Sequence, residues 1–229
     1  MTERNFLKEK ISTFALHYIE NNYKNLKCIG LGSGNTVKYF IERIPESFLS
    51  DLDFVSSSTD TTLFCNTLGI KILDILASDT LIDLYVDGAD SLFADQQICI
   101  KGRGGAMLRE KVLAYAAKEF FLLIESHKFE KKVKIPIEVL PFALNFVYDE
   151  LKKYQMNPVI RTAEGKLGPI VSDNNNYIID IMPEDYYYDK LHELDRELIG
   201  IPGIVCTGIF KREFKVVSDI EEEIKLFEV

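Results

Sequence analysis

The chain has little of what metal and disulfide sites are built from. Its 229 residues include three histidines and four cysteines. The histidines show no ligand spacing, and the cysteines lie far apart, mostly among apolar neighbours. We therefore expect reduced core thiols in place of a zinc site or a disulfide framework, and hence a cytoplasmic protein. The cysteines are Cys28, Cys65, Cys99 and Cys206.

Long apolar runs and basic clusters are also absent from the sequence. No segment approaches the roughly 18 consecutive apolar residues that a membrane span needs, and the charged N-terminal segment is unlike a secretory signal. The net charge of −9, without a block of lysine and arginine, repels nucleic-acid phosphates. We expect a globular protein with no membrane partner and no nucleic-acid partner.

Short apolar strands alternate with helices over the first 130 residues. Strands are predicted at 27–32, 54–58, 71–75, 81–86, 97–100 and 120–124, and helices at 5–22, 37–44, 61–68 and 111–118. This alternation predicts an α/β fold in which helices cover both faces of a mainly parallel, Rossmann-like sheet.

The pattern changes after residue 130. Helices are predicted at 143–154 and 186–199, and strands at 159–162, 177–181, 203–210 and 213–217. We expect a smaller α+β, ferredoxin-like domain over residues 131–207. Residues 208–229 are expected to return to the larger α/β domain of residues 1–130.

Polar motifs follow five of the predicted strands directly. They occupy residues 32–36, 56–59, 87–90 and 125–128, together with the loop that begins at Lys101. Ligands of parallel sheets bind beyond the carboxyl ends of the strands. We expect these five motifs to converge on one edge of the sheet.

The first motif, Gly32-Ser-Gly-Asn-Thr36, joins a predicted strand to a predicted helix. The hydroxyls of Ser33 and Thr36, with free backbone N–H groups, can hold a phosphate there. The dinucleotide fingerprint needs glycine where Asn35 stands, and the Gly-Lys-Ser/Thr of a Walker A loop is absent. In a simpler interpretation, Thr36 only caps the helix.

Asp87 and Asp90 flank a Gly-Ala turn. Two carboxylates this close can take hydroxyl protons or hydrogen-bond a polyol. Binding of a divalent metal is one alternative, and a turn without chemistry is another.

The segment from Lys101 to Glu110 joins a glycine-rich loop to the start of a helix. Glycines let backbone N–H groups approach a ligand, and a helix N-terminus favours negative charge, so the segment resembles an anion cradle beside a base. Alternatively, the glycines only permit positive φ, and Glu110 faces solvent like most helical glutamates. An ionised carboxylate beside a lysine acts as a base only if ligand binding desolvates it.

In their order and spacing, these motifs resemble ribose-5-phosphate isomerases of the A type. The likeness extends over nearly the whole chain, through residues 55–58, 136–141, Arg161, 171–176 and 201–205. It implies interconversion of D-ribose 5-phosphate and D-ribulose 5-phosphate through an enediolate, without a metal or cofactor, in the non-oxidative pentose phosphate pathway. It also implies a homodimer or homotetramer.

The resemblance implies a role for each motif. Glu110 matches the base that moves a proton between C1 and C2. Asp87 matches the acid/base group of ring opening, Asp90 holds hydroxyls, and Lys101 with its loop stabilises the enediolate. The implied substrate contacts are Lys8, Ser33, Gly34, Asn35, Thr36, Asp87, Gly88, Ala89, Asp90, Lys101, Gly102, Arg103, Gly104 and Lys128.

Three positions depart from the family pattern: Asn35, Ser91 and Arg103. Arg103, where glycine is usual, either adds a charge to the phosphate or a neighbouring group, or points to solvent. Two rival functions are a sugar-phosphate sensor of the kind found in transcription regulators, and a related enzyme, either an amino-sugar phosphate deaminase or an acyl-CoA transferase. A transcription regulator should carry a DNA-binding motif, and we expect no room for one before Cys28. The Lys101/Glu110 pairing does not support either of the related enzymes.

Overall fold

A computed structural model describes residues 3–74 and 81–229, so the last residue of the strand predicted at 71–75 lies outside it. The chain forms two compact units. Unit 1 comprises Met1–Ala89, Arg109–Phe129 and Arg212–Val229, and unit 2 comprises Asp90–Leu108 and Glu130–Lys211. None of the helices described has the length and apolar character needed to cross a membrane.

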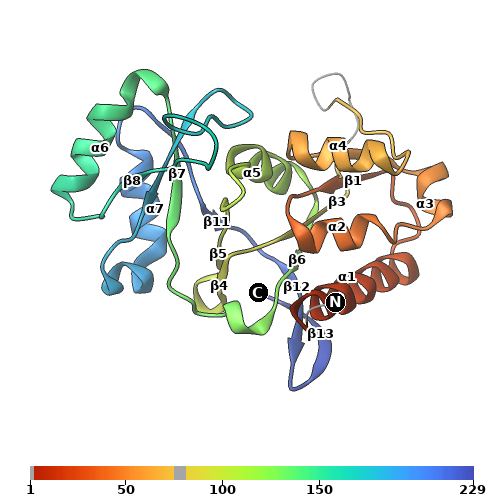
Figure 1. The fold of residues 1–229 in the computed structure, drawn as a ribbon. Coiled ribbons are helices and arrows are strands. Elements are labelled where there is room, and N and C mark those ends of the chain that lie inside the picture. The colour runs from red at the N-terminus through yellow and green to blue at the C-terminus, as the bar shows by residue number, and fades with distance from the viewer. Residues whose placement is uncertain (1–2, 75–80) are drawn as a thin grey trace. The chain divides into compact units, whose positions relative to one another are not determined.

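Unit 1 contains a six-stranded sheet in the order β13-β12-β6-β3-β1-β2 (Figure 1). Its strands are β1 (Cys28–Leu31), β2 (Asp53–Ser56), β3 (Leu84–Gly88), β6 (Glu119–Leu123), β12 (Lys215–Ile220) and β13 (Glu223–Glu228). Neighbouring strands from β12 to β2 run parallel, and β13 pairs antiparallel with β12. The predicted, mainly parallel sheet is confirmed.

The helices of unit 1 are α1 (Glu3–Asn22), α2 (Asn35–Ile41), α3 (Glu46–Asp51), α4 (Thr59–Thr67) and most of α5 (Met107–Ala116). Apolar residues of α1 and α2 pack against Leu84 and Val86 of β3. Because side chains alternate along a strand, Tyr85 and Asp87 lie together on the opposite face. The packing of Leu84 and Val86 in the core thus directs Tyr85 and Asp87 to the face of the sheet away from α1 and α2.

The strand predicted at 97–100 does not join the parallel sheet. β5 (Ile98–Ile100) pairs antiparallel with β4 (Ser91–Phe93) and β11 (Ile209–Lys211) in a separate three-stranded sheet. Only the 3₁₀ turn η2 (Ala94–Gln96) and Gln97 connect β4 to β5. So short a connection permits an antiparallel hairpin, whereas parallel neighbours need a crossover of a dozen or more residues.

Two other strand predictions also need correction. Within the described part of segment 71–75, the sheet contact is one isolated parallel bridge from Ile72 to Phe54. The strand predicted at 203–210 is divided at Gly208 into β10 (Ile204–Thr207) and β11. The domain boundaries stay a prediction; the compact units differ from them at residues 90–108, 130 and 208–211, which belong to unit 2, where β4 and β11 both pair with β5.

Unit 2 also contains a four-stranded antiparallel sheet, in the order β10-β7-β9-β8. Its further elements are β7 (Ile135–Val139), β8 (Val159–Ile160), β9 (Tyr177–Ile181), η4 (Pro141–Ala143), α6 (Leu144–Lys153), η5 (Asp185–Lys190) and α7 (Leu191–Ile199). Ile135, Ile137 and Val139 pack with both helices on one face. The predicted smaller α+β part of the fold is confirmed, and Pro136, Glu138 and Asp180 lie on its other face.

Candidate active site

The loop after β1 is built around two glycines. Gly34 has φ of 86° and stands at the N-cap of α2, a conformation that glycine adopts without strain. Thr36 is therefore inside the helix, and the interpretation of Thr36 as its cap is wrong. Thr61 donates a hydrogen bond of 2.7 Å to the carbonyl of Gly32, which ties the loop to the start of α4.

The carboxyl group of Asp87 lies directly against Gly32. A Cβ built on Gly32 would be 1.9 Å from Cγ of Asp87, so only glycine fits there. Asp87 is fully buried. Its Oδ1 accepts from the backbone N–H of Ser33 at 3.1 Å and of Gly88 at 2.7 Å, and its Oδ2 accepts from the Tyr85 hydroxyl at 2.5 Å. These three donors fix the orientation of the carboxyl group.

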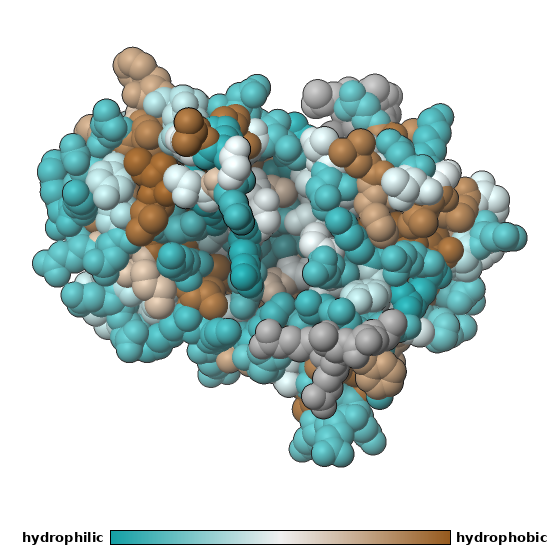
Figure 2. Space-filling view, in the orientation of Figure 1, coloured by the Kyte–Doolittle hydropathy of each residue, from teal (hydrophilic) through white to brown (hydrophobic). Residues whose placement is uncertain are grey.

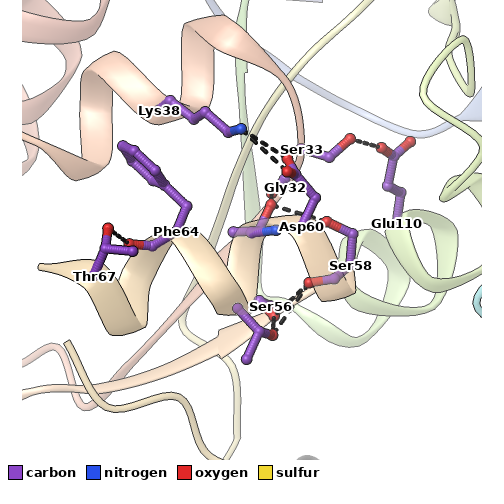
Figure 3. Close-up of polar contacts among 11 residues, drawn as sticks. Gly32, Ser33, Lys38, Ser56, Ser58, Asp60, Phe64, Thr67 and Glu110 are labelled. Carbon is purple, nitrogen blue, oxygen red and sulfur yellow. Dashed lines mark hydrogen bonds and ion pairs between the residues drawn. The ribbon is translucent and has the colours of Figure 1, made fainter. Parts of the chain in front are cut away.

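Glu110 lies in the first turn of α5 and is 2% exposed. The alternative in which this glutamate faces solvent is wrong. The hydroxyl of Ser33 donates to Oε1 of Glu110 at 2.5 Å, and Figure 3 shows the two side chains pointing toward one another. Burial, and then the charges of Asp87 and Glu110, raise the pKa of Tyr85 well above its usual value. Ser33 thus contacts both carboxylates, through its backbone and through its side chain.

A second cluster in unit 1 joins Lys8 and Lys128 through Glu125. Nζ of Lys128 lies 2.8 Å from Oε2 of Glu125 and donates to the carbonyl of Ala89 at 3.0 Å. Nζ of Lys8 lies 3.9 Å from Oε1 of Glu125. Burial raises the pKa of Glu125, but Lys128 and Lys8 outweigh it and leave that pKa below its usual value. The lysine side chains are partly exposed and can meet an anion.

The motif at 56–59 serves the fold. Ser58 caps α4, because its side chain accepts from the backbone N–H of Thr61 at 3.1 Å. The hydroxyls of Ser56 and Thr62 are 2.6 Å apart. Four of the five motifs follow strands of the six-stranded sheet, whereas the Lys101 loop follows β5 of the three-stranded sheet in unit 2. The convergence of all five motifs stays a prediction.

In unit 2, backbone contacts hold the Lys101 loop. The N–H of Lys101 donates to the carbonyl of Gly208 at 2.9 Å, and the N–H of Arg103 donates to Oδ2 of Asp90 at 3.1 Å. Gly102 and Gly105 have φ of 100° and 86°, which explains both glycines. Lys101 is 3% exposed, and its ammonium lies 5.6 Å from the ring centroid of Phe210.

The three departures from the family pattern differ in their surroundings. Asn35 and Arg103 are exposed, and Ser91 is fully buried. Exposure of Arg103 agrees with the interpretation that its side chain points to solvent, whereas its backbone takes part in the loop.

The predicted site residues fall into one group in each unit. Unit 1 holds Lys8, Ser33, Gly34, Asn35, Thr36, Asp87, Gly88, Ala89, Glu110 and Lys128, and unit 2 holds Asp90, Lys101, Gly102, Arg103 and Gly104. Tyr85 is not among the predicted site residues, although its position two residues before Asp87 in a strand places both on one face. Glu125 is not among them either.

Comparisons with known proteins point to one family. A family model described as ribose 5-phosphate isomerase A (phosphoriboisomerase A) matches residues 53–220. A relative of that name from Methanococcus maripaludis (strain C6) is 32% identical over 98% of this chain and 94% of its own length. Another, from Archaeoglobus fulgidus, is 35% identical over 81% of this chain and 83% of its own length.

Solved structures agree with this result. Ribose 5-phosphate isomerase A from Methanocaldococcus jannaschii has a TM-score of 0.87 and 30% identity, over 99% of this chain and all of its own. A D-ribose-5-phosphate isomerase in complex with phospho-erythronic acid has a TM-score of 0.84 and 31% identity, over 97% of both chains.

Proposed function

The chain belongs to the ribose 5-phosphate isomerase A family, and we propose that it interconverts D-ribose 5-phosphate and D-ribulose 5-phosphate. One observation carries the proposal: Ser33 hydrogen-bonds both buried carboxylates, Asp87 and Glu110. Isomerisation of an aldose needs ring opening and then a base for a proton on carbon. Asp87 accepts from backbone N–H groups and Tyr85, and Glu110 accepts from the Ser33 hydroxyl. These two carboxylates meet the two needs.

In the proposed mechanism, Asp87 opens the furanose ring. It takes the proton of the C1 hydroxyl, and a proton returns to the ring oxygen as the bond from C1 to that oxygen breaks. The product is an aldehyde at C1 with a free hydroxyl at C4. Asp87 suits this role because its backbone donors and Tyr85 fix its orientation.

Glu110 then removes the proton at C2. The electron pair of that C–H bond forms the double bond between C1 and C2, and the negative charge of the enediolate develops on O1. Glu110 returns the proton to C1 while the O2 proton moves to O1, which gives the ketose. In this proposal the cation of Lys101 and the N–H groups of its loop stabilise O1.

The phosphate is assigned to the loop at 33–36 and to Lys8 and Lys128. Glu125 supports this assignment, because it holds both lysines in unit 1 while their side chains stay partly exposed. Gly88, Ala89 and Asp90 are assigned to the sugar hydroxyls. We assign no metal or cofactor, since one base, one acid/base group and one oxyanion site account for every proton moved.

The test is ketose formation from ribose 5-phosphate in the presence of EDTA, by the wild type, Glu110→Gln and a surface control, Glu150→Gln. We expect turnover by the wild type and the control, and kcat at least ~100-fold lower in Glu110→Gln with substrate binding nearly intact. Absence of wild-type turnover would overturn the isomerase proposal. Turnover lost only with the chelator would overturn the metal-free mechanism, and an active Glu110→Gln would remove Glu110 as the base.

The finer predictions of a cytoplasmic homodimer or homotetramer in the non-oxidative pentose phosphate pathway are part of this proposal. The four cysteines are buried free thiols, which suits a reducing compartment.

Figure 2 shows a mostly hydrophilic face with hydrophobic surface over α3 and α4 and near β8. Phe142 and Leu167 in unit 2 are fully exposed, and we assign them to the subunit contact of the proposed oligomer. Light scattering of the purified protein measures the subunit number.

A further inference from the structure

The Lys101 loop rests on the face of the four-stranded sheet opposite α6 and α7. A Cβ on Gly102 would lie 2.9 Å from Cγ of Pro136 in β7, and one on Gly105 would lie 3.3 Å from Cδ1 of Ile178 in β9. The loop therefore lies close on the sheet, where no larger residue fits at Gly102. A residue on this face must therefore donate hydrogen bonds to the carbonyl groups of the loop.

Arg161 does so from the end of β8. Its Nε donates to Oδ2 of Asp180 at 2.8 Å, and its Nη2 contacts Oδ1 of the same carboxylate. Both side chains are 14% exposed. The backbone N–H of Arg161 donates to the carbonyl of Ile178 at 2.8 Å. A bidentate, mostly buried ion pair of this kind fixes the plane of the guanidinium group.

The remaining nitrogen of this guanidinium contacts the loop itself. Nη1 of Arg161 donates to the carbonyl of Gly102 at 3.0 Å and to the carbonyl of Arg103 at 3.1 Å. Two successive carbonyl groups are thus directed at one cation. In a trans peptide the N–H points opposite to the carbonyl. The N–H of Arg103 accordingly meets Asp90 at 3.1 Å, and the N–H of Gly104 points away from Arg161.

We propose that Arg161, held by Asp180, is a positioning residue that orients the peptide groups of Gly102 and Arg103 so that the N–H of Gly104 donates to the developing oxyanion. The inference rests on the isomerase activity proposed above. The guanidinium charge also polarises both carbonyls, which strengthens the N–H dipoles on the opposite side of the same peptide groups. Arg161 acts through the loop and does not touch the substrate.

Arg161→Lys tests this role, with Arg43→Lys as the matched control. Lysine keeps the positive charge, but it has no planar guanidinium group that can bind Asp180 and two carbonyl oxygens at once. Arg43 has the same kinds of partner in unit 1, since it pairs with Glu9 and donates to the carbonyl of Tyr39 at 2.9 Å. Asp180→Asn is a second variant that keeps the shape of the partner and removes its charge.

The readouts are kcat, KM, thermal unfolding, and inhibition by phospho-erythronic acid, whose carboxylate carries charge as the enediolate does. For Arg161→Lys we expect kcat ~10- to 100-fold lower, inhibitor affinity weaker by a similar factor, and KM changed less than ~3-fold. Asp180→Asn should show the same pattern more weakly, and Arg43→Lys should match the wild type.

Two results would overturn the proposal. One is an Arg161→Lys enzyme whose kcat and inhibitor affinity both stay within ~2-fold of the wild type. The other is a loss of activity that follows thermal unfolding, with KM and kcat changing together and inhibitor affinity unaffected, which indicates a merely structural role. An inactive wild type would instead contradict the proposed isomerase activity, so the two failures are distinguishable.

Discussion

Ser33 and Glu110 meet across 77 residues of sequence, through a hydrogen bond of 2.5 Å from the hydroxyl of Ser33 to Oε1 of Glu110. The backbone N–H of Ser33 donates at the same time to Asp87. The turn after β1 therefore aligns both carboxylates, one from β3 and one from α5. This coupling makes Ser33 the residue whose replacement most directly tests whether alignment matters.

Ser33→Ala should lower kcat about 10-fold, because loss of a hydrogen bond to a charged group leaves Glu110 less well oriented. The backbone contact to Asp87 is retained, so the fold should survive. Steady-state kinetics and thermal unfolding check both expectations. Ser50→Ala is the control, since Ser50 makes an exposed local bond to the carbonyl of Ser47 in α3. Equal kcat in the two variants would contradict the role of Ser33.

Gly32→Ala should destabilise the protein by about 1–3 kcal/mol, the usual cost of adding a methyl group to a packed site. The new Cβ would overlap the carboxyl group of buried Asp87, and displacement of that group should also abolish most activity. Urea unfolding measures the loss. Gly200→Ala is the control, because its Cβ would meet the carbonyl of Glu197 at 3.2 Å and needs only a small shift. A Gly32→Ala protein as stable and active as the wild type would show that the turn can move.

Much of this site could be predicted because it depends on local patterns. Strand-ending glycines, the carboxylates of Asp87 and Asp90, and the order of the motifs are all visible in the sequence. The burial of Glu110 is not, since a glutamate in a helix is usually exposed and its environment depends on Ser33, far away in the chain. Long-range partners of this kind follow from tertiary packing alone.

The misassigned strand at 97–100 has a related cause. Its apolar run is equally compatible with a parallel sheet and with a hairpin, and a short apolar run carries no information on its partners. The short connection through Ala94–Gln96 decides for the hairpin. The Lys101 loop consequently belongs to unit 2, where Arg161 supports it. No periodicity in the sequence indicates that contact.

Tyr85→Phe should lower both stability and activity. The hydroxyl of Tyr85 donates to Oδ2 of Asp87 at 2.5 Å, and both residues are fully buried. Its removal leaves a buried carboxylate with one donor fewer, at a cost of about 1–3 kcal/mol. The ring of Tyr85 still packs on Phe120, whose centroid is 5.0 Å away. We expect kcat to fall about 10-fold because Asp87 is less well oriented.

Tyr23→Phe separates the two effects of Tyr85→Phe. The hydroxyl of Tyr23 also donates to a carboxylate at 2.5 Å, that of Glu119, but neither residue belongs to the proposed site. Urea unfolding and steady-state kinetics of both variants should show that each loses stability and that only Tyr85→Phe loses activity. If Tyr23→Phe lost as much activity, the kinetic effect would be one of general stability.

Stability in acid should depend on Glu125. Its pKa is lowered in the folded protein by Lys128 and Lys8, so the folded state holds the proton less tightly than the unfolded chain. The stabilisation is therefore complete above the usual glutamate pKa of about 4.3 and is lost as the pH falls through the pKa of Glu125 in the folded protein.

Thermal unfolding of the wild type and Glu125→Gln between pH 6 and pH 3 measures this pH-dependent stabilisation. The wild type should lose more stability than Glu125→Gln over that range, because the variant has no proton to take up at this position. Other acidic groups contribute equally to both proteins, and parallel curves would mean that the lysine pair does not stabilise the charged form of Glu125.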